Sequence, residues 1–375
     1  MIVSKEFYEN LSSKGLSFFA GVPDSLLKDF CAYVTDHTPD DHNIIAANEG
    51  AATSLAAGYY LATGKIGLVY LQNSGFGNLI NPLLSLVDQD VYNIPVLFLI
   101  GWRGEPGKKD EPQHIKQGKK TIQLLETLDI PYVIMDGSLT SSATVINQAY
   151  QSMIQTNRPF AIVVSDGTFE PYTMQKKVKT NFPLNREQAI HIIIDRLQEN
   201  DIIVSTTGKT SREVFEYREK LKQGHEKDFL TVGSMGHASQ VALGIAISKP
   251  TRQVFCLDGD GAALMHLGSL AIIACSNAKN FKHIIINNGA HDSVGGQPTV
   301  GFSIDFNKIG IAVGYKKTLY AESAVDVQTA VKELRSSDGP SFLEIRVNKG
   351  SRNDLGRPKV SPVENKNNFM KFLFR

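Results

Sequence analysis

The sequence predicts an α/β protein made of two similar domains, each built on a parallel β-sheet. Three observations lead to this prediction. Short apolar runs alternate with helix-like stretches, as expected for strands joined by crossover helices. Glycine, Asp and Asn follow the ends of several apolar runs, where strands of an α/β sheet turn into loops. Finally, the chain resembles itself at a shift of 186 residues, which brings Leu68 onto Val254.

The internal repeat extends over strands and helices. Leu68–Gly75 falls on Val254–Gly261 without a gap, and the apolar strand Val96–Ile100 falls on Lys282–Ile286. At this chain length, one repetition indicates two domains rather than a solenoid. We place a first domain at residues 1–170, a linker of low periodicity at 171–184, and a second domain at 185–375.

Composition narrows the class of protein. The 375 residues suffice for two substantial cores, and 39 Lys and Arg balance 38 Asp and Glu. This balance argues against nucleic acid or an anionic membrane as a partner. No apolar run approaches the roughly 18 residues of a membrane span, and the first residues lack a leader pattern, so we expect a cytoplasmic protein with a small-molecule substrate. Cys31, Cys256 and Cys275 lie in apolar contexts, and we expect buried thiols in a reducing compartment.

The most informative motif is Gly259-Asp260-Gly261, followed by Asn287-Asn288. The triplet follows a predicted strand ending near Asp258, and a predicted helix over Ala262–Ala274 leads to the strand before the Asn pair. Both clusters therefore stand at the carboxyl ends of strands, where α/β sheets bind ligands. Glycines allow a diphosphate to approach the backbone at a helix N-terminus, and Asp260 and Asn288 supply oxygens that suit Mg²⁺. The alternative is a plain turn with an Asx cap.

The repeat also places two unlike triplets at equivalent positions. Asn48-Glu49-Gly50 falls on Ser234-Met235-Gly236, and we expect each triplet to open an alanine-rich helix. One domain thus carries a carboxylate where the other carries a soft apolar side chain. This asymmetry suits a cofactor held between two different halves.

With the Asn pair at this spacing, the triplet resembles the thiamine-diphosphate-binding motif. The whole chain is similar to thiamine-diphosphate-dependent decarboxylases reduced to a pyrimidine-binding and a diphosphate-binding domain, three-layer domains of the thiamine-diphosphate-binding fold, without the middle domain of larger relatives. Within that family it is most similar to the phosphonopyruvate decarboxylases and next to the sulfopyruvate decarboxylases. The segments that carry the resemblance are Gly21–Leu27, Asn48–Ala52, Asp110–His114, Gly233–Ala238, Asn287–Thr299 and Asp354–Pro358.

The resemblance implies a role for each matching residue around the cofactor. Glu49 would protonate or hydrogen-bond N1′ of the pyrimidine, and burial would displace its pKa. Met235 would wedge between the two rings and hold the cofactor bent. Mg²⁺ would be bound by Asp260, Asn288 and the carbonyl of Ala290, and the diphosphate cradle would comprise Gly208, Thr210, Gly259, Asp260, Gly261, Ala262 and Asn288. A P-loop at Gly208-Lys209-Thr210 is rejected because position 203 is Ile203 rather than glycine. The plain alternatives are a helix-capping Glu49 and a core Met235.

Fewer residues can be assigned to binding of the substrate. Asp24 and His114 match the polar pair above the reactive carbon, and His114 would donate a proton after carbon dioxide leaves. A substrate with a second anionic group needs cations, for which Arg103 and Arg357 are the preferred candidates. His291 and Gln297 lie just past the metal motif and are further candidates. Lysines around His114 are expected to be solvated surface charges.

These inferences predict a Mg²⁺- and thiamine-diphosphate-dependent 2-oxo acid decarboxylase. The resemblance implies conversion of 3-phosphonopyruvate to phosphonoacetaldehyde and carbon dioxide, in biosynthesis of the 2-aminoethylphosphonate type. Sulfopyruvate is the alternative substrate, and we expect a fused chain to favour phosphonopyruvate mildly. A carboligase of the acetolactate synthase type is disfavoured by the missing middle domain, and a non-catalytic paralogue by the intact Glu49, Asp260 and Asn288. The family also implies at least a homodimer with sites shared between subunits.

Overall fold

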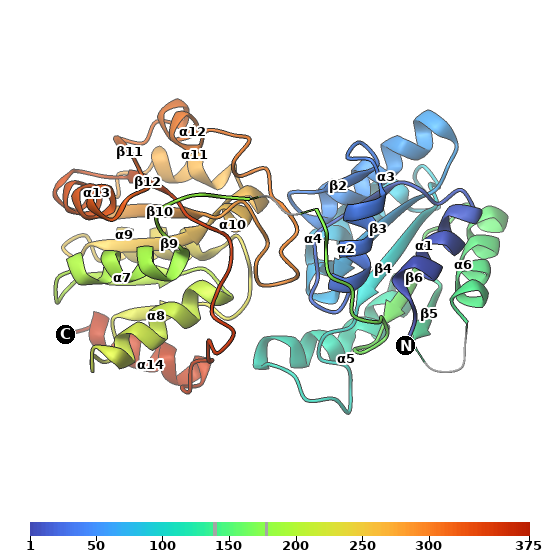
Figure 1. The fold of residues 1–375 in the computed structure, drawn as a ribbon, viewed down its shortest axis with the longest axis horizontal. Helices are drawn as coiled ribbons and strands as arrows, with labels where there is room; N and C mark the ends of the chain where they lie inside the picture. The colour runs from blue at the N-terminus through green and yellow to red at the C-terminus, as the bar shows by residue number, and fades with distance from the viewer. Residues whose placement is uncertain (138–140, 177–178) are drawn as a thin grey trace. The chain divides into compact units, whose positions relative to one another are not determined.

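The structure is a computed structural model that describes residues 1–375 except 138–140 and 177–178. The chain forms two compact units (Figure 1). Unit 1 comprises Met1–Val178 together with Val294–Gln297, and unit 2 comprises Lys179–Ser293 and Pro298–Arg375. The domain limits 1–170 and 185–375 stay predictions, and residues 177 and 178 of the predicted linker lie outside the described residues.

Unit 1 alternates strands and helices along the chain. Its elements are α1 (Ser4–Ser13), β1 (Phe19–Gly21), α2 (Lys28–His37), β2 (Asn43–Ile45), α3 (Glu49–Thr63), β3 (Gly67–Gln72), η1 (Asn73–Gly75), α4 (Phe76–Pro82), η2 (Leu83–Val87), β4 (Val96–Gly101), α5 (Pro112–Thr127), β5 (Tyr132–Met135), α6 (Ser142–Thr156) and β6 (Phe160–Val164). The six strands form one parallel sheet in the order β2-β1-β3-β4-β6-β5.

Unit 2 is built in the same way. Its elements are α7 (Arg186–Arg196), β7 (Ile202–Ser205), α8 (Lys209–Lys220), β8 (Asp228–Leu230), α9 (Ala238–Ser248), β9 (Val254–Gly259), α10 (Asp260–Met265), α11 (Ser269–Ala274), β10 (Phe281–Asn287), α12 (Phe306–Val313), β11 (Lys317–Ala321), α13 (Ala324–Ser336), β12 (Ser341–Arg346) and α14 (Pro362–Leu373). Its parallel sheet has the order β11-β12-β10-β9-β7-β8.

The two sheets share one topology. Read from the opposite edge, unit 2 is β8-β7-β9-β10-β12-β11, which matches the order of unit 1 strand for strand in chain sequence. The repeated stretch at Leu68 lies on β3 and its counterpart at Val254 opens β9, and both are third in their sheets. The predicted α/β fold with two similar parallel sheets is confirmed.

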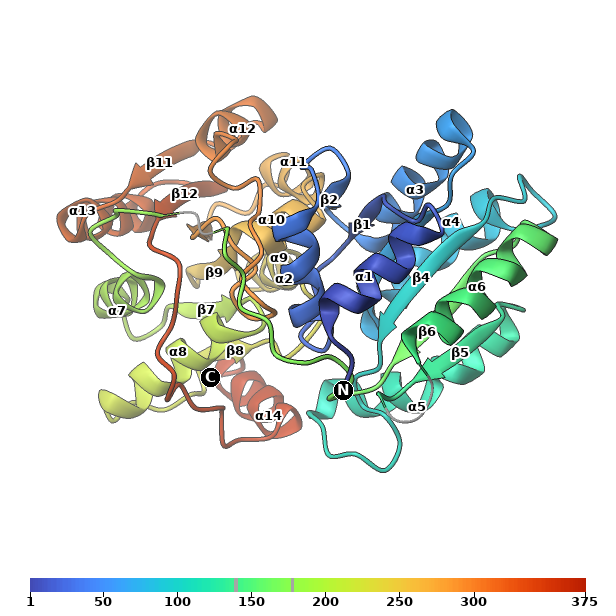
Figure 2. The same ribbon diagram turned by 45° about the vertical axis from the view of Figure 1, so that its right-hand side comes forward.

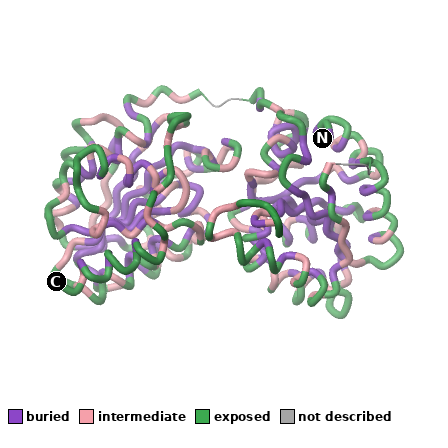
Figure 3. Tube along the Cα trace, turned by 90° about the horizontal axis from the view of Figure 1, so that it is seen from below, coloured by how far each residue is buried: buried purple, intermediate pink, exposed green. Residues whose placement is uncertain are grey.

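Each sheet is covered by helices on both faces, which gives three layers per unit (Figures 1 and 2). In unit 1, α1, α2 and α6 pack on one face and α3, α4 and α5 on the other. In unit 2, α7, α8 and α13 share a core, while α9, α11, α12 and α14 pack on the opposite face. Successive strand residues point to opposite faces, so Phe255 and Leu257 join one core while Val254 and Cys256 join the other. Burial is concentrated along the strands of each unit (Figure 3).

Several local predictions were wrong. The helix predicted over Ala262–Ala274 is two helices, α10 and α11, separated at His266–Gly268, where a glycine of low helix propensity precedes α11. Helix α9 begins at Ala238 rather than at the Ser234–Gly236 triplet, because Ser234 and Gly236 have positive φ values of 53° and 87°. Cys31 and Cys256 are buried, but Cys275 is exposed at the end of α11. Among the described residues, no helix combines the length and apolar character that a membrane span requires.

Candidate active site

Three neighbouring strands of unit 2 end where the cofactor motif begins. Gly259 is the last residue of β9 and pairs with Ile286 of β10, so both strands end at the same level. Asp260 then starts α10, and Asn287 closes β10 just before Asn288. Strand β7, which pairs with the other side of β9, leads into Gly208 and α8. The carboxyl edge of this sheet therefore gathers Gly208, Asp260 and Asn288, as the strand pattern predicts.

Asp260 is buried and its carboxylate has polar partners. Thr299 Oγ1 donates to Oδ2, and the backbone N–H of Asn288 donates to Oδ1 at 3.4 Å. Burial raises the pKa of Asp260 to about 6, while the hydrogen bonds from Thr299 and backbone N–H groups act in the opposite direction. A buried carboxylate of this kind is stabilised as an anion by a divalent cation.

The two asparagines have different surroundings. Asn287 donates through Nδ2 to Gly301 O at 2.7 Å and to Glu344 Oε1 at 2.8 Å, so this residue ties β10 to its neighbours. Asn288 donates through Nδ2 to Asp292 Oδ2 at 2.9 Å, and its Oδ1 accepts from Ala290 N at 3.1 Å. Asn287 Oδ1 likewise accepts from Gly289 N at 3.1 Å, so each amide oxygen accepts one backbone N–H, and Asn288 stays the predicted metal ligand.

The donor set fits the predicted ion. Asp260, Asn288 and the carbonyl of Ala290 offer a carboxylate, an amide oxygen and a backbone oxygen, which are ligands that Mg²⁺ accepts. Asp260 and Ala290 are buried, and Asn288 is 5% exposed. These residues would hold Mg²⁺, and the ion would neutralise the buried Asp260.

The backbone around the motif leaves room for a ligand. A Cβ added at Gly259 would meet nothing within 4 Å, whereas Gly208 has a φ of +90° that favours glycine. Thr210 is buried in the first turn of α8, and Ala262 is buried in α10. Free N–H groups at such helix starts suit a diphosphate.

Met235 and His291 both approach Gly261. A Cβ at Gly261 would be 2.9 Å from His291 Cε1 and 3.4 Å from Met235 Cε. His291 is 9% exposed, and burial lowers its pKa to about 4, so its imidazole is neutral at pH 7. Both side chains therefore approach the backbone of the triplet.

In unit 1, Glu49 is the first residue of α3, and Asn48 caps this helix by accepting from Ala51 N. Glu49 is 4% exposed, and burial raises the pKa of its carboxyl group, while the hydrogen bond that Asn78 Nδ2 donates to Oε2 at 2.7 Å lowers this pKa. A side chain at Gly75 would overlap Glu49 Oε1, so glycine at that position makes room for the acid. The raised pKa agrees with the expected effect of burial on Glu49.

Asp24 follows β1 and is fully buried. Gln72 Nε2 donates to Oδ1 at 2.5 Å, and the N–H groups of Leu26 and Leu27 donate to Oδ2. Burial raises the pKa of Asp24 against these hydrogen bonds and the nearby Arg103. Gln72 pairs with Gly101 across β3 and β4, and a side chain at Gly101 would overlap Asp24 Oδ2.

Arg103 and His114 lie on the same side of unit 1. The Arg103 guanidinium donates to both oxygens of Asp110 and, through Nη1, to Ser25 Oγ at 2.8 Å. His114 is the third residue of α5, and its Nδ1 is buried without a hydrogen-bond partner among the described atoms. Burial, with a smaller contribution from Arg103, lowers the pKa of His114 to about 4. Its imidazole is therefore neutral at pH 7 and can donate an N–H.

The remaining candidates lie elsewhere. Arg357 is exposed in the loop between β12 and α14 of unit 2. Gln297 is 1% exposed, belongs to unit 1, and has an Oε1 with no partner among the described atoms. The structure thus brings Asp260, Asn288, Ala290, Met235 and His291 together in unit 2, and Asp24, Arg103 and His114 in unit 1.

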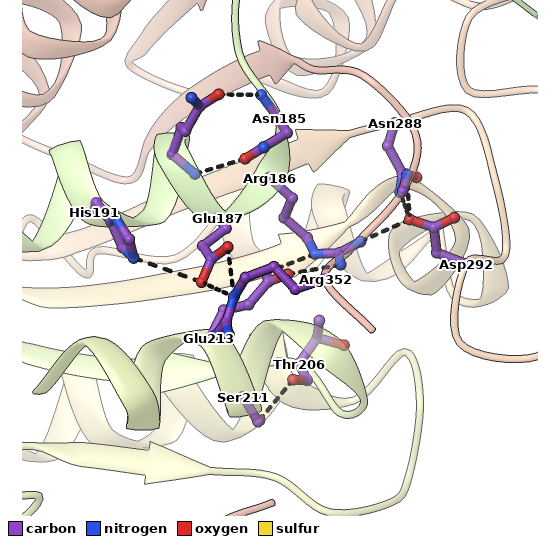
Figure 4. Close-up of polar contacts among 12 residues, drawn as sticks. Asn185, Arg186, Glu187, His191, Thr206, Ser211, Glu213, Asn288, Asp292 and Arg352 are labelled. Carbon is purple, nitrogen blue, oxygen red and sulfur yellow. Dashed lines mark hydrogen bonds and ion pairs between the residues drawn. The ribbon is translucent and has the colours of Figure 1, made fainter. Parts of the chain in front are cut away.

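Sequence reasoning missed the residues that hold the predicted ones. These are Gln72, Asn78, Thr299, Asp110 and the group Arg186, Glu213 and Asp292 (Figure 4). Thr299, Asp292 and Asp110 lie within quoted motifs, and Gln72 ends a predicted strand, so these four carried a signal. Arg186 opens α7 outside every motif and carried none, whereas Glu213 lies on α8 three residues after Thr210 of the Gly208–Thr210 motif.

The chain matches two family descriptions. Residues 1–124 match the thiamine pyrophosphate enzyme, N-terminal TPP binding domain, and residues 206–345 match the thiamine pyrophosphate enzyme, C-terminal TPP binding domain. Phosphonopyruvate decarboxylase of Streptomyces viridochromogenes is 32% identical over 388 residues, covering 100% of this chain and 95% of the relative. The enzyme of the same name from Streptomyces hygroscopicus is also 32% identical, covering 99% and 94%.

The chain therefore belongs to the thiamine-pyrophosphate-dependent decarboxylases. Sulfopyruvate decarboxylase of Methanosarcina acetivorans is 26% identical, covering 97% of this chain and 96% of its own. That relative matches both domains in one chain, whereas the alpha and beta subunits of the Methanocaldococcus jannaschii sulfopyruvate decarboxylase match separate parts, 46% and 41% of this chain. The expectation that a fused chain mildly favours phosphonopyruvate stays a prediction. The resemblance to phosphonopyruvate decarboxylases first and sulfopyruvate decarboxylases second is confirmed.

Proposed function

We propose that this decarboxylase uses Mg²⁺ and thiamine diphosphate to convert 3-phosphonopyruvate to phosphonoacetaldehyde and carbon dioxide, as a step in phosphonate biosynthesis. The observation that carries the choice of substrate is the 32% identity to phosphonopyruvate decarboxylases over essentially the full length of both chains, against 26% for the sulfopyruvate enzyme. The buried donor set at Asp260 and Asn288 supports the cofactor and metal.

The chain's own residues have definite tasks in this proposal. When bound, thiamine diphosphate supplies the nucleophilic carbon and the electron sink for decarboxylation. Asp260, Asn288 and Ala290 hold the metal, and the N-termini of α8 and α10 offer N–H groups to the diphosphate. Glu49, with its raised pKa, would donate a proton or a hydrogen bond to N1′ of the pyrimidine. Met235 supports the cofactor rings.

Asp24 and His114 would act on the substrate side. Asp24 is fixed by Gln72 and two backbone N–H groups. Because His114 is neutral at pH 7, it would donate a hydrogen bond to the substrate. Donation of a proton to the carbanion would require the imidazolium form, which the lowered pKa of His114 disfavours. Arg103 and Arg357 stay proposed contacts to the anionic head group, and His291 and Gln297 stay proposed contacts to the substrate. The ion pair of Arg103 with Asp110 weakens its attraction for a dianion relative to an unpaired guanidinium.

The test is a substrate comparison. Purified protein with Mg²⁺ and thiamine diphosphate is offered phosphonopyruvate, sulfopyruvate and pyruvate, and release of each aldehyde is measured. We expect the largest kcat/KM with phosphonopyruvate. A preference for sulfopyruvate would assign the second candidate, which the full-length match to the Methanosarcina enzyme supports. Turnover of none of the three would refute both.

A further inference from the structure

A buried chain of charged side chains runs from α7 and α8 to Asn288 (Figure 4). Arg186 donates through Nε and Nη2 to the two oxygens of Glu213 at 2.8 and 2.9 Å, and through Nη1 to Asp292 Oδ2 at 3.1 Å. The side chains of Arg186, Glu213 and Asp292 are 7%, 1% and 7% exposed. Charge-assisted bonds in such a dry setting are strong and geometrically specific.

One oxygen of Asp292 receives three hydrogen bonds. Its Oδ2 accepts from Arg186 Nη1, from Asn288 Nδ2 at 2.9 Å, and from the backbone N–H of Gly350 at 3.0 Å. The two donors other than Asn288 come from α7 and from the loop after β12. Two other parts of unit 2 therefore hold Asp292 in place independently of its contact with Asn288.

The loop that supplies Gly350 is itself fastened to the same helices. Arg352 pairs with Glu187 at 2.9 Å and with Glu216, and Gly356 N donates to Glu216 Oε1 at 2.6 Å. Glu187 follows Arg186 on α7, and Glu216 lies one turn after Glu213 on α8. The same two helices therefore hold both Arg186 and the loop bearing Gly350.

The contact with Asp292 determines which way the amide of Asn288 faces. An ionised carboxylate only accepts, so it selects the NH₂ group and repels the amide oxygen. Asn288 Oδ1 is therefore turned away from Asp292, where it accepts from Ala290 N at 3.1 Å and keeps a second lone pair. With the amide reversed, the NH₂ group would stand against the N–H of Ala290, where it cannot accept that hydrogen bond.

We propose that Asp292, held by Arg186 and Glu213, is a positioning residue that presents Asn288 Oδ1 to the divalent cation. This inference rests on the metal site of the proposed function. It concerns residues outside the predicted ligand set, and it assigns a task to a buried ion-pair network that would otherwise only contribute to stability.

The test measures metal affinity in the full chain with thiamine diphosphate present, using Mn²⁺ as the probe and electron paramagnetic resonance to count unbound ions. We expect Asp292→Ala to weaken Mn²⁺ binding by about 10- to 100-fold, as loss of such outer contacts does elsewhere. Arg186→Gln should weaken it in the same direction, and serves as the second variant if Asp292→Ala does not fold.

Asp228→Asn is the matched control. Asp228 is buried and receives two bonds from Arg218 in the same unit, at 2.9 and 3.0 Å. Within the described part of the chain, neither Arg218 nor Asp228 is hydrogen-bonded to a residue of the predicted site. The control should lower Tm and leave the affinity for Mn²⁺ within twofold of wild type.

A double variant separates orientation from mere stability. In Asn288→Asp both oxygens are equivalent, so no orientation needs to be selected. Asp292→Ala should then cause no further loss of Mn²⁺ affinity in that background. The inference is overturned if Asp292→Ala and Arg186→Gln lower Tm as Asp228→Asn does but bind Mn²⁺ as tightly as wild type. If wild-type protein binds no Mn²⁺ with thiamine diphosphate, the metal site itself is refuted, and this inference with it.

Discussion

At the scale of single residues, burial changes the acid–base behaviour of three carboxyl groups. Glu49, Asp24 and Asp260 each follow a strand or open a helix, and burial raises the pKa of all three. Their partners differ. Glu49 receives one bond from Asn78, Asp24 is bonded by Gln72 and backbone N–H groups, and Asp260 is bonded by Thr299. Asn78 donates to Oε2 of Glu49, whereas both carboxyl oxygens of Asp24 and both of Asp260 accept hydrogen bonds.

Glu49→Gln should retain thiamine diphosphate but lose turnover by about 10²- to 10⁴-fold, because glutamine keeps the shape and loses the exchangeable acid. The measurements are cofactor affinity, turnover, and the rate of deuterium exchange at C2 of the bound cofactor. Glu9→Gln, at an exposed position of α1, is the control. Exchange at the wild-type rate in Glu49→Gln would show that this acid does not act on the pyrimidine.

His114 predicts a pH-dependent stability. Its folded pKa of about 4 lies below the ordinary value near 6.5, so protonation favours the unfolded chain. The stabilising contribution is complete above about pH 6.5 and is lost as pH falls toward 4. As pH decreases through this window, we therefore expect the Tm of wild type to fall more than the Tm of His114→Gln. Parallel Tm curves for the two proteins would contradict the assigned shift.

At the scale of elements, one glycine at the end of η1 allows this segment to pack against Glu49 on α3. Gly75 is buried beside Glu49, and a Cβ there would overlap its carboxyl group, whereas a Cβ at Gly77 of α4 would meet nothing within 4 Å. Gly75→Ala should cost about 1–3 kcal/mol of stability through overpacking and should displace Glu49. Gly77→Ala, two residues away, should be neutral or stabilising by up to about 1 kcal/mol.

Chemical denaturation and turnover of the two alanine variants measure this difference. We expect Gly75→Ala to lose both stability and activity and Gly77→Ala to lose neither. If both variants behave alike, the space at position 75 is not what holds Glu49 in place.

Strands and motifs were predictable from sequence because their signals are local. The apolar runs Val96–Ile100 and Lys282–Ile286 located β4 and β10 to within one residue at each end, and the strand predicted to end near Asp258 is β9, which ends at Gly259. The break between α10 and α11 was missed because a single glycine at 268 competes with an otherwise apolar helical pattern. Partners such as Asn78 for Glu49, and Arg186 for Asp292, depend on how separate helices pack, and no spacing in the sequence encodes that.

At the scale of the whole molecule, the proposed catalytic residues are divided between the units. Glu49 belongs to unit 1 and Asp260 to unit 2. In the family this chain belongs to, we expect an active assembly of at least two chains, with each site drawing on two subunits.

Subunit mixing tests this expectation. Inactive Glu49→Gln and Asp260→Ala proteins, unfolded and refolded together, should recover activity, because one of the two sites in a mixed dimer then carries both intact residues. Each variant refolded alone is the control. A fully active monomer in sedimentation experiments would contradict the shared site.

The common strand order bears on how the protein can diversify. Gly75 and Gly261 occupy equivalent positions after equivalent strands, yet one leaves space for Glu49 and the other for His291. Two copies of one scaffold therefore offer two sets of strand ends that accumulate substitutions separately. We expect substrate range to evolve mainly through changes beside Asp24 and Arg103 in one copy, while the other copy keeps its hold on the cofactor.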